Sequence, residues 1–143
     1  MFVLNLEGLP TRVMEKIRLL LVEDDVDDVQ LLQEAMRDNK IDVEIDVIME
    51  GDKVMPYLNS INNLPDIIVM DFNLPKIHGK EVLVSIRSTP AFSAIPLVVL
   101  TTSASPHDIQ FATENGANKF ITKPSTIHGF NSAVQAIIAI VRS

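Results

Sequence analysis

The sequence predicts an α/β fold in which helices cover both faces of a five-stranded parallel sheet. Strand-like and helix-like segments alternate along the chain, which is typical of parallel strands joined by helical crossovers. The strand-like segments are short apolar runs rich in Leu, Ile and Val, as expected for strands buried on both faces. Four of these runs end in reactive polar residues. Because ligands bind outside the carboxyl ends of such strands, the sequence also predicts a site at that edge of the sheet.

The first two strand–helix units are expected in the first half of the chain. The first strand covers residues 17–22 (IRLLLV), and a helix is predicted over 27–38. Val29, Leu32, Ala35 and Met36 recur on one face of that helix, near the 3.6-residue period. The second strand is predicted over 43–48 and the second helix over 52–61.

The other three units are predicted as strands 67–71, 97–101 and 119–122, followed by helices 79–87, 106–115 and 127–141. The fourth helix has clear boundaries, because Ser105 suits the N-cap, Pro106 the first helical position and Gly116 the residue just past its end. We expect a flavodoxin-like doubly wound sheet with strand order 2-1-3-4-5. That order places the first and third strands side by side at the switch point.

The 143 residues fit one domain, which we place at residues 14–143 after an N-terminal extension at 1–13. Met14 could be the true start of the native product. Apolar residues would let the extension dock on the domain or on a neighbour, with disorder as the alternative; they are Phe2, Val3, Leu4, Leu6 and Leu9.

Composition excludes several classes of function. The chain has no cysteine, so disulfides, thiolate metal sites and cysteine nucleophiles are ruled out. No apolar stretch reaches the roughly 18 residues needed to span a bilayer, and the first residues do not form a secretory signal. The net charge is −7, and 17 of the 19 acidic residues lie at or before Glu81, which argues against nucleic-acid binding. We expect a cytoplasmic protein.

The polar residues at the strand ends form one chemical set. Glu23 and Asp24 follow the first strand, and Asp71 follows the third. Two carboxylates about 4 Å apart would repel by about 4 kcal/mol at an effective dielectric of 20. A hard cation such as Mg²⁺ relieves that repulsion, and a carboxylate beside it can act as a nucleophile towards phosphorus. Thr101 and Lys123 offer a hydroxyl and an ammonium group to the phosphorylated product.

With these residues in place, the chain resembles the receiver domain of two-component response regulators from Ile17 to Arg142. The run LLLVEDD resembles the family's first strand with its acidic pair, Glu23 and Asp24. The run IIVMDFNLP, with the later Gly79, resembles the phosphoacceptor segment and places the acceptor on Asp71. The runs IPLVVLTTS and FITKP place the family's switch hydroxyl on Thr101 and its lysine on Lys123.

The resemblance implies a phosphoacceptor protein whose catalysis is limited to its own phosphoryl transfer and autodephosphorylation. It implies Mg²⁺ bound by Asp24, Asp71 and the main-chain carbonyl of Asn73, with Glu23 acting mainly through water. Phe120 would turn inward when Thr101 moves to the phosphoryl group. The Lys123–Pro124 bond, often cis in this family, is expected to be cis.

The resemblance also implies a sensor histidine kinase or a phosphotransfer protein as the phosphoryl donor. The segments VEDDVDDVQLL and VVLTTSASPHD are most similar to those of stand-alone receivers associated with bacterial phytochrome-type kinases. Two features depart from the common pattern. Thr102 replaces a small residue after the switch position, and Asp25, with Asp27 and Asp28, adds negative charge beside the site. We expect Asp25, Asn73 and Thr102 to modulate the site.

The last helix is apolar nearly all round, which is typical of a helix buried on two sides. We expect one stripe to cover the sheet; its residues are Ile127, Phe130, Val134, Ile137, Ile138 and Val141. Ala133, Ala136, Ala139 and Ile140 would form a second face that contacts another subunit or a signalling target, with an exposed alanine-rich helix as the alternative. In the family, the fourth helix, fifth strand and fifth helix often form such a surface. We therefore expect that the chain can form a homodimer through these elements.

Two other functions stay open at this point. A phosphatase of the haloacid dehalogenase type would use the run from Asp25 to Val29, which fits its D-x-D-x-[TV] pattern. That mechanism needs further acids after the lysine, and none occurs from Lys123 to Ser143. The other alternative is an interaction module that keeps the fold and uses no phosphate. A nucleotide- or flavin-binding site lacks support, because neither G-x-G-x-x-G nor a P-loop occurs.

Overall fold

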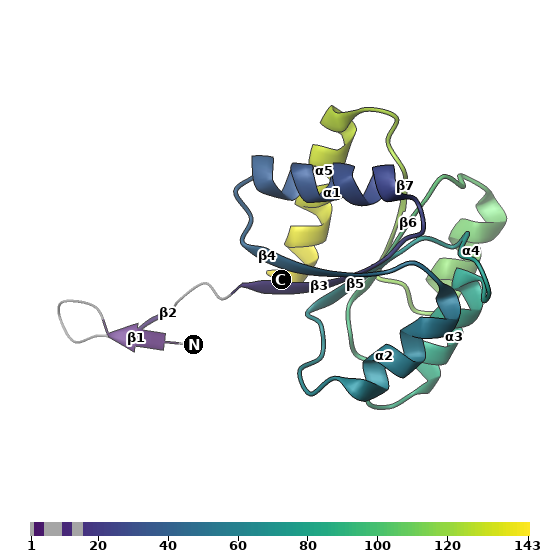
Figure 1. Ribbon diagram of the computed structural model, residues 1–143, viewed down its shortest axis with the longest axis horizontal. Coiled ribbons are helices and arrows are strands. Elements are labelled where there is room, and N and C mark those ends of the chain that lie inside the picture. Colours follow the sequence, from purple (N-terminus) through teal and green to yellow (C-terminus); the bar gives the residue numbers. More distant parts are fainter. Residues whose placement is uncertain (1, 5–9, 13–15) are drawn as a thin grey trace.

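The computed structural model describes residues 2–4, 10–12 and 16–143. Its centre is a five-stranded parallel sheet in the order β4-β3-β5-β6-β7, shown in Figure 1. The strands are β3 (Ile17–Val22), β4 (Val43–Ile48), β5 (Ile67–Met70), β6 (Leu97–Thr101) and β7 (Lys119–Thr122). Counted from β3, this is the expected order 2-1-3-4-5, so the predicted flavodoxin-like fold is confirmed.

Helices cover both faces of the sheet (Figure 1). Helices α1 (Val26–Asp38) and α5 (Ile127–Val141) lie on one face, and α2 (Val54–Ser60), α3 (Gly79–Ser88) and α4 (Pro106–Glu114) lie on the other. Each face has its own apolar cluster. The central strands β5 and β6 are buried along their whole length, which explains why they read as continuous apolar runs.

One local detail differs from the expectation for the second helix. This segment is divided into a 3₁₀ turn, η1 (Gly51–Lys53), and α2. A side chain on Gly51 would collide with the carbonyl oxygen of Ile77, because its Cβ would lie 2.0 Å away. The tight packing of this turn against the loop after β5 therefore requires glycine at its first position.

The N-terminal segment contains two short strands that sequence reasoning did not predict. Strands β1 (Phe2–Leu4) and β2 (Pro10–Arg12) pair antiparallel, with Val3 opposite Thr11. They form a two-stranded sheet separate from the main one. The expected docking through Leu6 and Leu9 falls outside the described residues.

Helix α5 corrects the predicted faces. Ile127 was expected to cover the sheet, yet it is 53% exposed, because it lies in the first turn before the helix reaches the strands. Ala133 was assigned to the outer face, yet it is buried. The buried positions Phe130, Ala133, Val134, Ile137 and Ile138 follow the i, i+3, i+4, i+7, i+8 pattern of one helical stripe.

Part of the second apolar face of α5 is covered within the same chain. Helices α1 and α5 pack against each other, and their side chains belong to one apolar cluster. Polar contacts join the same pair of elements, since Asn39, just past the end of α1, bonds to Asn131 at 3.0 Å and to Gln135 at 2.7 Å. Among the described residues, no helix is long and apolar enough to span a membrane.

Candidate functional site

The carboxyl ends of β3, β5, β6 and β7 bring the predicted polar residues together. Val22 and Met70 are register partners in neighbouring strands, so Glu23 and Asp71 leave the sheet side by side. The Asp71 amide donates to the Val22 carbonyl at 3.0 Å, and the Lys123 amide donates to the Thr101 carbonyl at 2.7 Å. These backbone bonds fix where each functional side chain begins.

Three carboxylates converge at this edge. Each of Glu23, Asp24 and Asp71 has a carboxylate oxygen that lies within 4.8 Å of an oxygen of the other two. Glu23 and Asp71 are buried, with exposures of 2% and 5%, whereas Asp24 is exposed. The donor set is therefore all oxygen, anionic and open on one side, which fits a hard divalent cation that keeps some of its water.

Lys123 neutralises part of this charge. Its Nζ lies 2.7 Å from Glu23 Oε1, 2.8 Å from Asp71 Oδ2 and 2.7 Å from Asp28 Oδ2. The side chain is 6% exposed. Burial alone would lower the pKa of Lys123, but its bonds to the Asp28, Asp71 and Glu23 carboxylates raise that pKa above the ordinary value. The ammonium group is therefore charged throughout the neutral range.

The pKa values of the two buried acids are shifted in opposite directions. Burial alone would raise the pKa of Asp71, but the bond from Lys123, the nearby Thr101 hydroxyl and the Asn73 amide together outweigh it, and the pKa is lowered. In Glu23 burial dominates over the bonds from Lys123 and the Asp25 amide, and the pKa is raised to about 7. The site thus favours the ionised form of Asp71 more than that of Glu23.

The loop after β5 holds Asp71 through its backbone. The Asn73 amide donates to Asp71 Oδ1 at 3.0 Å, while Asn73 itself is exposed. The Gly79 amide donates to the Phe72 carbonyl at 2.7 Å. A Cβ on Gly79 would lie 2.4 Å from the Asp71 carbonyl oxygen and 2.6 Å from Phe72 Cα. The first residue of α3 can therefore approach the segment that carries Asp71 only because it has no side chain.

The residues expected to switch lie beside the carboxylates. Thr101 is fully buried, and its Oγ1 has no hydrogen-bond partner among the described residues. It nevertheless lies near enough to lower the pKa of Asp71. Phe120 is half-buried and packs edge-on against Phe72, with ring centroids 6.1 Å apart. Thr102 is exposed.

Asp25 and Asp28 take different positions in the first turn of α1. Asp25 is exposed and caps the helix, since its Oδ1 accepts from the amides of Asp27 at 2.9 Å and Asp28 at 3.3 Å. Its side chain is not part of the carboxylate cluster, which removes the geometry that the phosphatase alternative requires. Sequence reasoning treated Asp28 only as nearby charge and missed its contact with Lys123. The available signal was its spacing, one helical turn after Asp24.

The Lys123–Pro124 bond was expected to be cis, and this expectation is wrong: the described chain contains no cis peptide. The trans form is the lower-energy state of most bonds that precede proline, and here it still brings the Lys123 side chain to the carboxylates.

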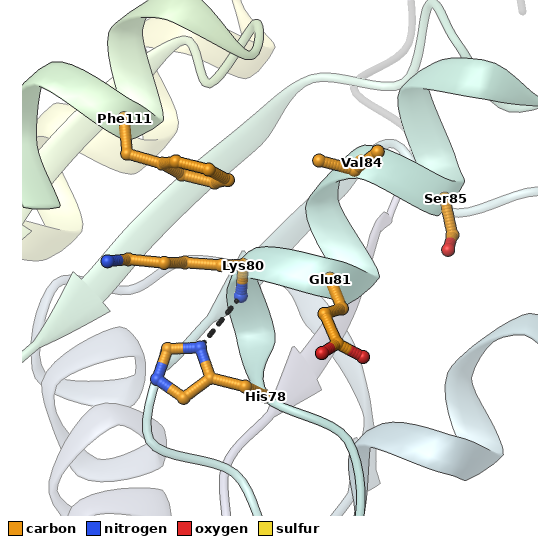
Figure 2. A pocket seen from close by; sticks show the side chains of 6 residues that line it. All are labelled: His78, Lys80, Glu81, Val84, Ser85 and Phe111. Atoms are coloured by element: carbon orange, nitrogen blue, oxygen red, sulfur yellow. Dashed lines mark hydrogen bonds between the residues drawn. The ribbon is translucent and has the colours of Figure 1, made fainter.

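A separate groove of about 630 Å³ lies beside α3 and α4, lined by His78, Lys80, Glu81, Val84, Ser85 and Phe111. Figure 2 shows the Lys80 side chain running along the Phe111 ring, with the ammonium 5.2 Å from the ring centroid. The His78 ring nitrogen Nδ1 accepts the Lys80 amide at 3.1 Å, which caps α3. None of the predicted site residues lines this groove.

Comparisons with known proteins show what the whole chain is similar to. The family model of the response regulator receiver domain matches residues 19–135. Response regulator Rcp1 of Synechocystis sp. is 36% identical over 124 residues, covering 83% of this chain and 84% of that protein. The crystal structure of the phosphorylated cyanobacterial phytochrome response regulator RcpA superposes with a TM-score of 0.82 at 34% identity, covering 90% of this chain and 96% of that one. The Mn²⁺-bound form of Rcp1 gives a TM-score of 0.78 at 34% identity, covering 86% and 92%.

Proposed function

This chain belongs to the response regulator receiver family, and from that premise we propose that it is a stand-alone phosphoacceptor of a two-component system, with Asp71 as the acceptor. The observation that carries the proposal is the convergence of the buried Asp71 with two further carboxylates and Lys123. The stand-alone arrangement is supported by similarity over 84% of Rcp1 and 96% of the RcpA chain.

In the proposed reaction, a carboxylate oxygen of Asp71 attacks the phosphorus of a phosphohistidine on the donor. A P–O bond forms as the P–N bond breaks, and the electron pair of that bond returns to the imidazole nitrogen. The lowered pKa of Asp71 keeps the nucleophile ionised without a separate base. Lys123 stands 2.8 Å from Asp71 Oδ2, where it would stabilise the charge that phosphorylation adds.

We assign Mg²⁺ to the carboxylate cluster, held by Asp24, Asp71 and the main-chain carbonyl of Asn73, with Glu23 acting through water. When bound, this ion supplies charge neutralisation for the acid cluster and for the incoming phosphoryl oxygens. Support comes from the all-oxygen donor set and from the Mn²⁺ bound by Rcp1, since both ions suit carboxylate and carbonyl oxygens.

The proposed signalling response to phosphorylation depends on Thr101. Its buried hydroxyl has no partner among the described residues, and a phosphoryl group would supply acceptor oxygens. We propose that Thr101 moves to these oxygens and that the half-buried Phe120 turns inward behind it. Phosphorylation would thereby shift the population that binds a partner.

We propose a histidine kinase or a phosphotransfer protein as the natural donor, because such proteins carry the phosphohistidine that this reaction consumes. The phytochrome response regulators among the similar structures support a phytochrome-type kinase. A homodimer through α4, β7 and α5 remains our proposal for the assembly. Size-exclusion mass measured with and without a phosphoryl mimic would test it, and a monomer in both conditions would contradict it.

The test of the phosphoacceptor is incubation with acetyl phosphate and Mg²⁺, followed by intact mass. Wild-type protein should gain one phosphoryl group, and Asp71→Asn should gain none. Asp66→Asn is the matched control, because Asp66 precedes β5 and Asp71 follows it; this variant should be labelled like wild type. An unlabelled wild type, or an equally labelled Asp71→Asn, would overturn the proposal.

A further inference from the structure

Lys123 has one carboxylate partner that stands outside the candidate metal cluster. Two of its three partners, Glu23 and Asp71, belong to that cluster. The third, Asp28, comes from α1, and its Oδ2 lies 2.7 Å from Lys123 Nζ. The contact joins residues 95 positions apart in the sequence, so it exists only in the folded protein.

Asp28 is held in place by the first turn of α1. Its amide donates to Asp25 Oδ1 at 3.3 Å, which fixes the backbone from which its side chain extends. Its side chain is 21% exposed, whereas the Lys123 side chain is 6% exposed. The preceding residue, Asp27, is also an acid, but it is exposed and has no ion pair with any other described residue.

We propose that Asp28 is a positioning residue, which holds the Lys123 ammonium beside Asp71 when a cation and a phosphoryl group occupy the other carboxylates. This inference rests on the proposed phosphoacceptor function. In the metal-free protein the ammonium shares its charge among three carboxylates. A divalent cation would compete for Glu23 and Asp71 and would repel the ammonium.

Under those conditions the full negative charge of Asp28 still acts on Lys123, because Asp28 lies outside the metal cluster. Its close contact with the ammonium offsets the cation's repulsion, because a charged hydrogen bond in a site that is largely shielded from water is stronger than one in bulk water. Lys123 then stays within reach of Asp71 Oδ2, at the position where the phosphoryl group arrives. Without Asp28, the flexible lysine side chain would have no anionic partner among the described residues apart from groups already shared with the cation.

The first experiment measures the rate at which Asp71 is labelled by acetyl phosphate in saturating Mg²⁺. Asp28→Asn should slow labelling by about tenfold, the effect of losing one hydrogen bond between charged groups. Asp27→Asn removes the same charge from the same turn and should stay near the wild-type rate. Asp28→Glu restores the carboxylate and should recover most of the rate. Equal rates for Asp28→Asn and Asp27→Asn would overturn the inference.

The second experiment does not depend on phosphorylation or metal. Thermal unfolding in chelator is compared for wild type, Asp28→Asn, Lys123→Met and the double variant. Asp28→Asn should lower Tm in the wild-type background and should not lower it in Lys123→Met, where it relieves repulsion among the acids. The same shift in both backgrounds would overturn the inference. If wild type is not labelled at Asp71 while this coupling is present, the proposed function fails and the Asp28–Lys123 contact stands.

Discussion

At Thr101, a hydroxyl is buried inside an otherwise apolar strand, without a hydrogen-bond partner among the described residues. Such a group costs free energy, and the switch role proposed above would give it the partner that it lacks. Thr101→Val keeps the shape and removes the hydroxyl. The free energy of unfolding of the metal-free protein should stay unchanged or rise by up to about 1 kcal/mol, measured by urea unfolding.

The comparison for this prediction is Thr101→Ser, which keeps the hydroxyl and removes a buried methyl group. It should lose about 1 kcal/mol of stability. Thr101→Val should still be phosphorylated on Asp71 but should show no phosphorylation-dependent partner binding. A large stability loss in Thr101→Val would mean that the hydroxyl already has a partner in the resting protein.

Gly79 lies so close to neighbouring backbone atoms that there is no room for a side chain. An added Cβ would meet backbone atoms of Asp71 and Phe72 at 2.4 and 2.6 Å, and neither backbone atom can move alone. Gly79→Ala should therefore cost about 1–3 kcal/mol of stability by overpacking and should slow phosphorylation by displacing Asp71. Urea unfolding and acetyl phosphate labelling measure the two effects. Ser85→Ala, at an exposed position of the same helix, should change neither.

Between elements, a series of polar side-chain contacts joins α3 to the loop that follows β6. Lys80 on α3 forms an ion pair with Asp108 on α4, and Asp108 also accepts from the Ser103 hydroxyl at 2.6 Å. The Ser105 hydroxyl in turn caps α4 by accepting the Asp108 amide at 3.2 Å. If Thr101 moves as proposed, this loop should move with it, so the ion pair should hold α4 in the position that the structure shows.

This ion pair predicts a pH dependence of stability. The hydrogen bond from Lys80, followed by that from Ser103, holds the pKa of Asp108 below its ordinary value of 3.8. The native state therefore binds fewer protons than the unfolded chain in that range. The stabilisation is complete above the unfolded pKa and is lost as the pH falls through the folded pKa. The stability difference between wild type and Asp108→Asn should be constant above about pH 5 and should shrink below it.

Urea unfolding at a series of pH values measures this difference. In the Lys80→Met background the ion pair is absent, so the stability change caused by Asp108→Asn should be smaller at neutral pH and should vary less on acidification. A pH profile that is identical in both backgrounds would show that Lys80 is not the partner responsible.

The strands were more predictable than the helix contacts, for a physical reason. The bounds of β3, β4, β6 and β7 agree with the sequence expectation. In β3 and β6, burial demands a nearly continuous apolar run, whereas β4 and β7 are partly exposed and were recognised by the turn residues that bound them. Helix α5 is apolar on most of its circumference, so its sequence alone did not distinguish the sheet from α1 or from an external partner. Ala133 was misassigned for that reason, since a small residue suits both a tight internal contact and an outer face.

The N-terminal strands illustrate another limit. A three-residue strand has little periodicity to detect, so the sequence did not indicate that Phe2–Leu4 pairs with Pro10–Arg12. The apolar character of this segment was visible in the sequence, whereas its antiparallel pairing was not.

For the whole molecule, the topology determined how much of the site could be foreseen. Once the first and third strands are neighbours, Glu23, Asp24 and Asp71 must meet at one edge, and Lys123 must face them from β7. Asp28 could not be derived in this way, because its contact depends on how α1 leaves the sheet and on the rotamer that Lys123 adopts. Strand order predicts which residues share an edge, and side-chain packing decides which of them touch.

The same topology concentrates uncompensated negative charge, and this predicts a metal dependence of global stability. Three carboxylates lie within 4.8 Å of one another, and a single ammonium group cannot neutralise them. A cation that binds only the folded state raises the free energy of unfolding, by about 1.4 kcal/mol for each tenfold rise in concentration above its dissociation constant. Tm should therefore increase with Mg²⁺ beyond the increase that NaCl produces at matched ionic strength.

The variant that tests this prediction is Asp24→Asn, because Asp24 belongs to the cluster without contacting Lys123. In chelator its stability should equal or exceed that of wild type, since one repulsive charge is gone, yet its Tm should respond weakly to Mg²⁺. Asp27→Asn removes an equal charge outside the cluster and should keep the full Mg²⁺ response. If Asp24→Asn and wild type gained equally from Mg²⁺, the ion would be stabilising the protein from somewhere else, and the cluster would lose its assignment as the metal site.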